Sequence, residues 1–196
     1  MFKRTVQTVT YLPHFISIMV VCGMILDFTS VDGIINDIIV FLGGERVAIM
    51  LRPQLFVPVY VSTDIWQGVG WGSIIYMASL AATDQDMYEA ATIDGAGRWK
   101  QALHISIPCL VPTIVIMLIL RLGQVMNVGF EKIILLYNSN TYETADVISS
   151  FVYRRGLLDF DFGFSSAVGL FNSLTNFSIL ILANKLSRRL SETSLW

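Results

Sequence analysis

The chain has 196 residues, of which 54% are hydrophobic and only 14% are charged. Soluble domains usually carry about 25% charged residues, so this composition excludes an ordinary soluble domain as well as collagen-like, disordered and disulfide-stapled classes. The formal net charge of -2 provides no basic excess for nucleic acid, which we exclude as a partner.

The charges are absent from four long runs of the sequence. A helix needs about 20 apolar residues to cross a bilayer, and each run is long enough. We therefore predict an all-α membrane helix bundle, a single transmembrane domain over residues 1–196. Its four spans lie at about 6–28, 57–82, 109–130 and 163–184. The first run also resembles a signal peptide, but it has no convincing cleavage site and is interpreted as a retained helix.

The distribution of basic residues outside the spans predicts the orientation of the chain. One set of flanks holds seven Lys and Arg residues and the other holds five, together with most of the loop acids. By the positive-inside rule, both termini and the loop 83–108 are cytoplasmic, in a multi-pass protein of the plasma membrane surrounded by lipid. The larger set is Lys3, Arg4, Arg98, Lys100, Lys185, Arg188 and Arg189, and the smaller set is Arg46, Arg52, Lys132, Arg154 and Arg155.

Two short helices are predicted in the outer segments. In the first, between Asp32 and Arg52, isoleucines recur at helical spacing until Gly43 and Gly44 end the pattern. The second runs from Ala145 to Leu158. Each helix is either a plain connector or the surface that receives an external partner.

The loop 83–108 has clear helix punctuation. Thr83 or Asp84 caps a first helix, which Gly95 and Gly97 end. A second short helix is predicted from about Arg98, with a break at Pro108 where the third span starts. An ordinary connection between spans and a docking site for a partner are equally compatible with this pattern.

The order of residues in this loop resembles the EAA motif of the permease subunits of binding-protein-dependent ABC importers, E-A-A-x3-G-x9-I-x-L-P. Only the penultimate position differs, because Ile107 stands where the family usually has Leu. Asp94 before the glycine is also common in that motif. The matching residues are Glu89, Ala90, Ala91, Gly95, Ile105, Ile107 and Pro108.

The resemblance implies a type I, MetI-like fold and a function in ATP-driven import. The loop would be the coupling helix that sits in a cleft of a separate ABC ATPase subunit, with Glu89 making a polar contact there. The chain itself would not be an enzyme and would bind no cofactor or metal; it contains no G-x-x-x-x-G-K-[ST] phosphate loop. The implied partners are two ATPase subunits, a second permease subunit in a heterodimer, and an extracytoplasmic solute-binding protein of a bacterium.

Three further stretches resemble the carbohydrate-uptake branch of these permeases, and most of all the subgroup that imports oligosaccharides derived from polysaccharides. They are Tyr11–Pro13, Asp64–Trp71 and Gly163–Ala167. The resemblance thus implies a sugar substrate. Because the family normally has five or six spans, we also expect that this chain lacks one or two N-terminal helices of the fold.

Polar residues within the spans are candidates for the solute path. Arg121, Gln124 and Asn127 lie on one side of the third predicted span, and Asn172 and Asn176 lie on one face of the fourth. The alternative for Arg121 is a position at the headgroups or an ion pair with Asp64, and the alternative for the asparagines is interhelical packing. In the second span, the Gly68 and Gly72 pair suggests close helix approach.

Two other function classes remain possible from the residues alone. An intramembrane enzyme would use the histidines His14 and His104, but no G-x-S-x-G or H-E-x-x-H pattern accompanies them. A stand-alone channel or secondary transporter would not need the coupling loop.

Overall fold

The computed structural model describes residues 2–190, except for the side chains of Lys3, Arg189 and Leu190, and it has no β-strand in that range. The predicted all-α fold is confirmed. Two of the basic side chains used to predict orientation, Lys3 and Arg189, lie outside the description. The chain divides into two compact units, residues 1–71 with 127–170 and residues 72–126 with 171–196, and each is described by itself.

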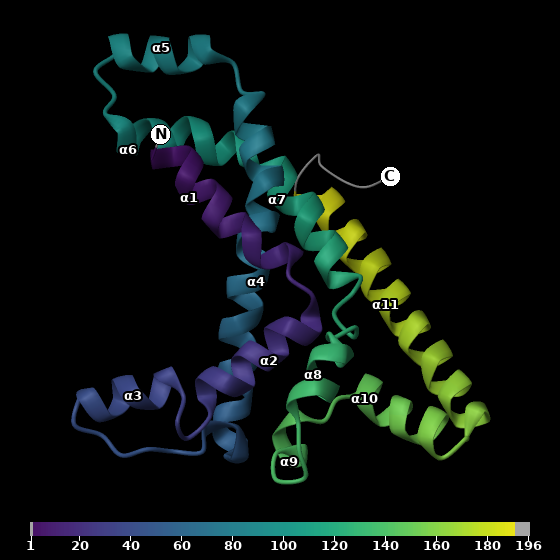
Figure 1. Ribbon diagram of the computed structural model, residues 1–196. Helices are drawn as coiled ribbons and strands as arrows, with labels where there is room; N and C mark the ends of the chain where they lie inside the picture. Colours follow the sequence, from purple (N-terminus) through teal and green to yellow (C-terminus); the bar gives the residue numbers. More distant parts are fainter. Residues whose placement is uncertain (1, 191–196) are drawn as a thin grey trace. The chain divides into compact units, whose positions relative to one another are not determined.

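The first unit begins with α1 (Phe2–Tyr11), a 3-10 turn (Leu12–Phe15), α2 (Ile18–Thr29) and α3 (Ile34–Phe41), in the purple part of the ribbon (Figure 1). A second 3-10 turn (Ile49–Leu51) leads into α4 (Pro53–Ala81), whose residues up to Trp71 belong to this unit. The predicted short helix in the first outer segment is confirmed as α3, and the positive φ of 87° at Gly43 follows its end.

The first predicted span, 6–28, is not one continuous helix. Pro13 is buried in the 3-10 turn, and the backbone then becomes extended at Ile16 and Ser17 before α2 begins. Proline cannot donate a backbone hydrogen bond, so the helical pattern of α1 ends there. The prediction failed because it followed the absence of charge and gave too little weight to this one proline.

The rest of the first unit consists of short helices and the start of the last long one: α8 (Phe130–Leu136), α9 (Tyr142–Ala145), α10 (Ile148–Tyr153), a π-helical turn (Arg154–Leu158) and α11 (Phe162–Leu190). The second predicted outer helix, 145–158, corresponds to α10 with its π-helical turn. The core of the unit lies between α2, α4 and α8. Its buried side chains are Val21, Cys22, Ile25, Met50, Phe56, Leu136 and Ala145.

The second unit holds the end of α4, α5 (Gln85–Ile93), α6 (Arg98–Gln101), a π-helical turn (Ala102–Ser106), α7 (Ile107–Leu122) and the end of α11. Thr113 of α7 donates a hydrogen bond to Ser79 of α4 over 2.9 Å. The end of α7 approaches α11 closely, because a Cβ on Gly123 would meet the side chain of Leu180.

The helix that starts at Arg98 does not break at Pro108. The Ile107 amide donates to the Ala102 carbonyl five residues back, so the chain widens into a π-helical turn just before the proline. This wider turn accommodates the ring and the missing N–H of Pro108, and the helix continues as α7.

Three stretches are long and apolar enough to cross a membrane within the described residues: Ile18–Phe41, Arg98–Leu122 and Phe162–Arg188. They overlap the first, third and fourth predicted spans. The third ends at Leu122 rather than residue 130, because residues 123–129 form no helix. The second predicted span, 57–82, lies in the 29-residue helix α4, which is not among the three, and its crossing of the membrane stays a prediction.

Close helix approach in α4 occurs at Gly70 and not at Gly68 or Gly72. A Cβ on Gly70 would overlap the carbonyl oxygen of Thr10 in α1, whereas a Cβ on Gly68 or Gly72 would meet no described atom within 4 Å. The spacing of small residues indicated the correct helix but the wrong glycines. The single domain over residues 1–196 stays a prediction.

Candidate functional site

The loop 83–108 is a hairpin of two helical arms with defined ends. Asp84 caps α5 by accepting a hydrogen bond from the Asp86 amide over 3.0 Å. At the other end, Gly95 has a φ of 75°, and the Gly95 and Ala96 amides donate to the carbonyls of Thr92 and Ala91. This is a Schellman motif, in which glycine meets the requirement for positive φ. The predicted cap at Asp84 and bend at Gly95 are confirmed.

Side-chain hydrogen bonds close the hairpin on itself. The hydroxyl groups of Tyr88 and Ser106 are 2.9 Å apart. Gln101 donates through Nε2 to Thr92 Oγ1 and to the Ala96 carbonyl, each over 3.0 Å. Sequence reasoning missed these ties, because none of the five residues stands out until the two arms face each other. The hairpin therefore holds its shape within this unit without a partner.

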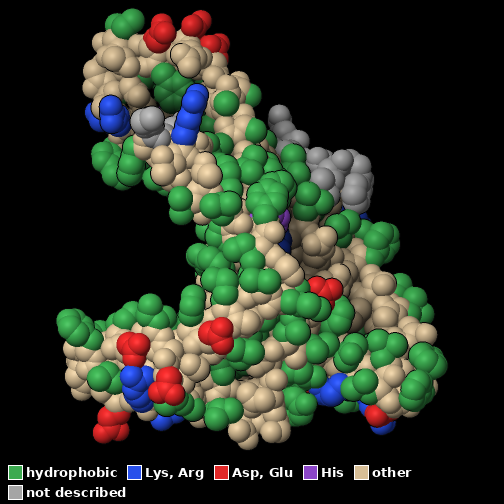
Figure 2. All heavy atoms as spheres, in the orientation of Figure 1, with side chains coloured by type: hydrophobic (Ala, Val, Ile, Leu, Met, Phe, Trp, Pro, Cys, Tyr) green, Lys and Arg blue, Asp and Glu red, His purple; other side chains and the backbone are tan. Residues whose placement is uncertain are grey.

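Most motif residues lie on the surface of the hairpin. Glu89, Ala90, Asp94 and Gly95 are exposed, Ala91 is half-buried, and acidic side chains gather along α5 (Figure 2). Near the C-terminal end of the motif, Ile105 is buried while Ile107 and Pro108 are exposed. The motif thus combines residues that hold the hairpin with residues that remain free for contact.

Two large apolar side chains beside the motif are almost fully exposed. Ile93 is 86% and Trp99 is 90% accessible within the described residues. Exposed apolar side chains beside a structured polar motif indicate a surface that another protein covers.

The polar candidates at the end of α7 are on the surface of the second unit. Arg121 is exposed and lies in the last turn of α7, where the negative end of the helix dipole stabilises a cation. Asp64 belongs to the first unit, where it pairs with Lys132. Gln124 is also exposed, and Asn127 belongs to the first unit.

The two asparagines of α11 differ in their environment. Asn176 is buried, and its Oδ1 accepts a hydrogen bond from the Met126 amide over 3.2 Å. This supplies a partner to an amide in the non-helical segment that follows α7. One turn earlier, Asn172 Oδ1 is buried and has no hydrogen-bond partner among the described residues. A buried carbonyl oxygen of this kind calls for a water or another donor.

Lys132 is a buried charged residue that sequence reasoning missed. It is 97% buried in α8, 3.8 Å from Asp64 of α4 and 5.0 Å from the ring centre of Tyr60. Burial lowers the pKa of Lys132, and the Asp64 charge opposes this shift. In the sequence Lys132 is one of several loop cations, and nothing in its neighbours signals burial.

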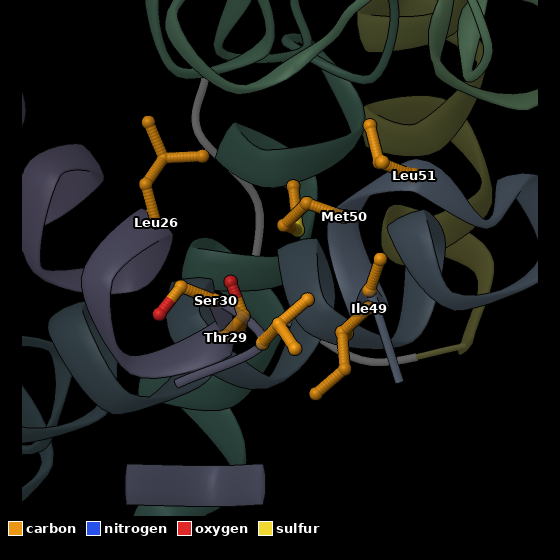
Figure 3. A pocket seen from close by; sticks show the side chains of 8 residues that line it. Leu26, Thr29, Ser30, Ile49, Met50 and Leu51 are labelled. Atoms are coloured by element: carbon orange, nitrogen blue, oxygen red, sulfur yellow. The ribbon is translucent and has the colours of Figure 1, made fainter. Parts of the chain in front are cut away.

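Cavities lie at two places in the first unit. One of about 160 Å³ lies at the end of α2 and is lined by Leu26, Thr29, Ser30 and residues 48–51 (Figure 3). Ligand pockets are usually about 300–1,000 Å³, so it is too small for an oligosaccharide. The other, of about 390 Å³, is lined mainly by apolar side chains of α2 and α8, with Glu131 as a carboxylate. Neither offers the several donors that sugar hydroxyl groups need.

Comparison with known proteins gives a match over nearly the whole chain. Residues 1–192 match the family described as the binding-protein-dependent transport system inner membrane component. Two relatives from Bacillus subtilis align with the full chain: a polygalacturonan/rhamnogalacturonan transport system permease protein, YteP, at 40% identity, and protein LplB at 38%. The chain spans 61% and 62% of the length of these relatives.

A solved structure is similar over the same range. A chain of a bacterial alginate ABC transporter, in complex with an alginate pentasaccharide-bound periplasmic protein, superposes with a TM-score of 0.95 at 43% identity. The match covers 99% of this chain and 68% of that one.

Proposed function

Because the chain belongs to the family of binding-protein-dependent transport system inner membrane components, we propose that it is a permease subunit of an ABC importer for a carbohydrate. The family places it in the cell membrane as a multi-pass protein. The observation that carries the proposal is the closed hairpin 83–108, with exposed Glu89 and Gly95 in its left-handed bend. A channel or secondary transporter does not couple to a separate ATPase subunit and therefore does not need such a hairpin.

The hairpin couples the membrane helices to ATP hydrolysis in a separate subunit. Two ATPase subunits that close on each other would push on the exposed α5, and the continuous helix from Arg98 to Leu122 would carry the displacement into the membrane. Rigid helices transmit such movements because packed elements shift as bodies. ATP is hydrolysed on the partner. This chain supplies the docking residues Glu89, Ala90, Ala91, Asp94, Gly95, Ile107 and Pro108, and the buried Ile105 supports them from within the hairpin.

The solute is proposed to be an oligosaccharide derived from a polysaccharide. Support comes from the names of similar proteins, which refer to polygalacturonan and rhamnogalacturonan in one case and to alginate in the other. A second permease subunit, two ATPase subunits and an extracytoplasmic solute-binding protein complete the proposed assembly. The solved alginate ABC transporter is in complex with a periplasmic protein, which supports the solute-binding partner in this proposal.

The solute path is proposed to include Arg121, Gln124, Asn127, Asn172 and Asn176. Asn172 has the strongest support. Its buried Oδ1 has no hydrogen-bond donor in the part of the chain that the structure describes, and a sugar hydroxyl or a water would supply one. Asn176 also accepts a hydrogen bond from the Met126 amide, so its replacement should also disturb the structure.

Uptake in the assembled importer tests the coupling role. Glu89→Gln removes the charge from the exposed face of α5, and we expect it to reduce both uptake and solute-stimulated ATP hydrolysis. Asp86→Asn is the matched control, because Asp86 is also exposed on α5 but lies outside the motif. Unchanged uptake with Glu89→Gln, or an equal loss with Asp86→Asn, contradicts the proposal.

A further inference from the structure

The helix α3 leaves a continuous apolar face uncovered. At about 100° per residue, Ile34, Ile38 and Phe41 fall on one line of the helix, and their exposed fractions are 56%, 54% and 88%. Ile35 and Leu42, which border this line, are 36% and 77% exposed. No polar side chain interrupts the face.

A buried amide fixes the direction in which this face points. Asn36, on the opposite side of α3, is fully buried. Its Nδ2 donates to the carbonyls of Ser30 and Val47 over 2.7 and 2.9 Å, and its Oδ1 accepts from the Val47 amide over 2.8 Å. Rotating α3 to hide its apolar face would break these three bonds and leave a buried amide unpaired.

Charged groups follow the other edge of α3. Arg46 bonds the Asp37 carboxylate over 2.6 Å and the Val31 carbonyl over 2.6 Å, and it lies 3.7 Å from Asp32. In Figure 2 the hydrophobic side chains of α3 follow its upper edge and the charged ones lie below. In Figure 1 the upper edge is the side toward which α4 runs from Pro53.

This arrangement fits a helix in the surface of a bilayer. The chain turns between α2 and α3 at Ser30–Gly33, within the apolar stretch Ile18–Phe41. With eight residues, α3 extends about 12 Å and cannot cross the hydrocarbon. An amphipathic helix with an aliphatic face and a charged edge instead lies in the interface, with the apolar face among the acyl chains.

We propose that α3 is a membrane-surface anchor. Its face of Ile34, Ile38 and Phe41 is embedded in the lipid leaflet where α2 ends, and the Asp37–Arg46 pair faces the headgroups and water. Lipid is favoured over a soluble protein as the occupant, because protein interfaces usually mix aromatic and polar groups and this face is aliphatic with one phenylalanine. The proposal rests on membership of a membrane-protein family and not on the nature of the solute.

Spin labels on single cysteines test the proposal in the full-length protein, reconstituted into phosphatidylcholine and phosphatidylglycerol vesicles. The free cysteines Cys22 and Cys109 are first replaced by Ala and Ser. Labels are then placed at Phe41→Cys and Ile38→Cys on the apolar face and, as the matched control, at Glu45→Cys beyond the end of α3. Molecular oxygen concentrates in lipid, and a water-soluble nickel complex does not enter it.

We expect oxygen to relax the labels at 41 and 38 more strongly than the nickel complex does, and we expect the reverse order at 45. Stronger relaxation by nickel at 41 and 38 places the face in water and overturns the proposal. Protection from both reagents at 41 and 38 means that protein covers the face, which also overturns it. If such protection arises only when a solute-binding protein is added, the face is a docking surface for that protein.

Discussion

Lys132 and Asp64 join α8 to α4, with Nζ of the lysine 3.8 Å from Oδ1 of the aspartate. The two ends of this ion pair differ in exposure, because the Lys132 side chain is 4% and the Asp64 side chain 64% accessible. The lysine also donates to the Tyr60 carbonyl over 3.5 Å. The buried ammonium group therefore depends on one exposed carboxylate, on a weak contact to a carbonyl, and on the Tyr60 ring, whose centre is 5.0 Å from Nζ.

Removing the carboxylate should destabilise the protein more than removing the buried charge. Asp64→Asn leaves the ammonium group with only its weak contacts, and we expect a loss on the order of 1 to 3 kcal/mol in the free energy of unfolding. Lys132→Met fills a similar volume without a charge and should be neutral or stabilising. Denaturant titration of both variants in the same detergent measures the difference. The opposite order would mean that the pair contributes net attraction beyond the desolvation of the lysine.

The Asp146–Arg154 pair should make stability depend on acid pH. Arg154 donates to both carboxylate oxygens, which lowers the pKa of Asp146 below its ordinary value. The folded state then binds a proton less readily than the unfolded state, so stability from this pair is fully present above the ordinary pKa. It is lost as the pH falls from the ordinary pKa of an aspartate through the lowered pKa of Asp146. Unfolding titrations across this range should show that acid lowers the free energy of unfolding of Asp146→Asn less than that of the unmodified protein.

Gly70 should tolerate a methyl group less well than the neighbouring glycines of α4. A Cβ at Gly70 overlaps the Thr10 carbonyl, and overpacking of this kind costs about 1–3 kcal/mol. Gly72→Ala has open space and should be neutral or slightly stabilising, because alanine is the better helix former. Thermal unfolding of the two variants is the measurement. Equal stability of both would show that α1 moves away from α4 without cost.

Gly95 should be more sensitive to substitution than Gly97. A side chain at the positive φ of Gly95 costs about 1–2 kcal/mol for an L-residue. Gly97, with a φ of -68°, accepts alanine without backbone strain. Hydrogen exchange of the amides in residues 85–106 reports this directly. We expect faster exchange in Gly95→Ala and no change in Gly97→Ala, and Gly95→Asn should lie between them, because asparagine tolerates this conformation.

The sequence predicted the elements that have strong local signals. The Asp84 cap, the Gly95 bend and the helix α3 follow from short-range chemistry, and the family followed from the spacing of motif residues. The first predicted span is not one continuous helix, because a proline ends α1 inside the uncharged run. The predicted break at Pro108 was wrong, because the helix continues through the proline. A π-helical turn at residues 102–106 accommodates the ring, and this turn has no sequence signature.

Contacts between distant segments could not be predicted in the same way. Burial of Lys132 depends on Tyr60 and Asp64, about 70 residues earlier in the chain, and the partner of Asn176 is a backbone amide. Local periodicity contains no information about either. Small residues in α4 indicated close approach, but the choice among three glycines depends on where α1 passes.

The π-helical turn also determines how force can travel along the chain. Because the backbone hydrogen bonds are not interrupted at Pro108, Arg98 to Leu122 form one continuous helical stretch of 25 residues, which changes direction between α6 and α7 (Figure 1). The proline at which the sequence suggests a break is therefore part of a continuous but bent helix, and a displacement of α6 reaches α7 through unbroken backbone hydrogen bonds.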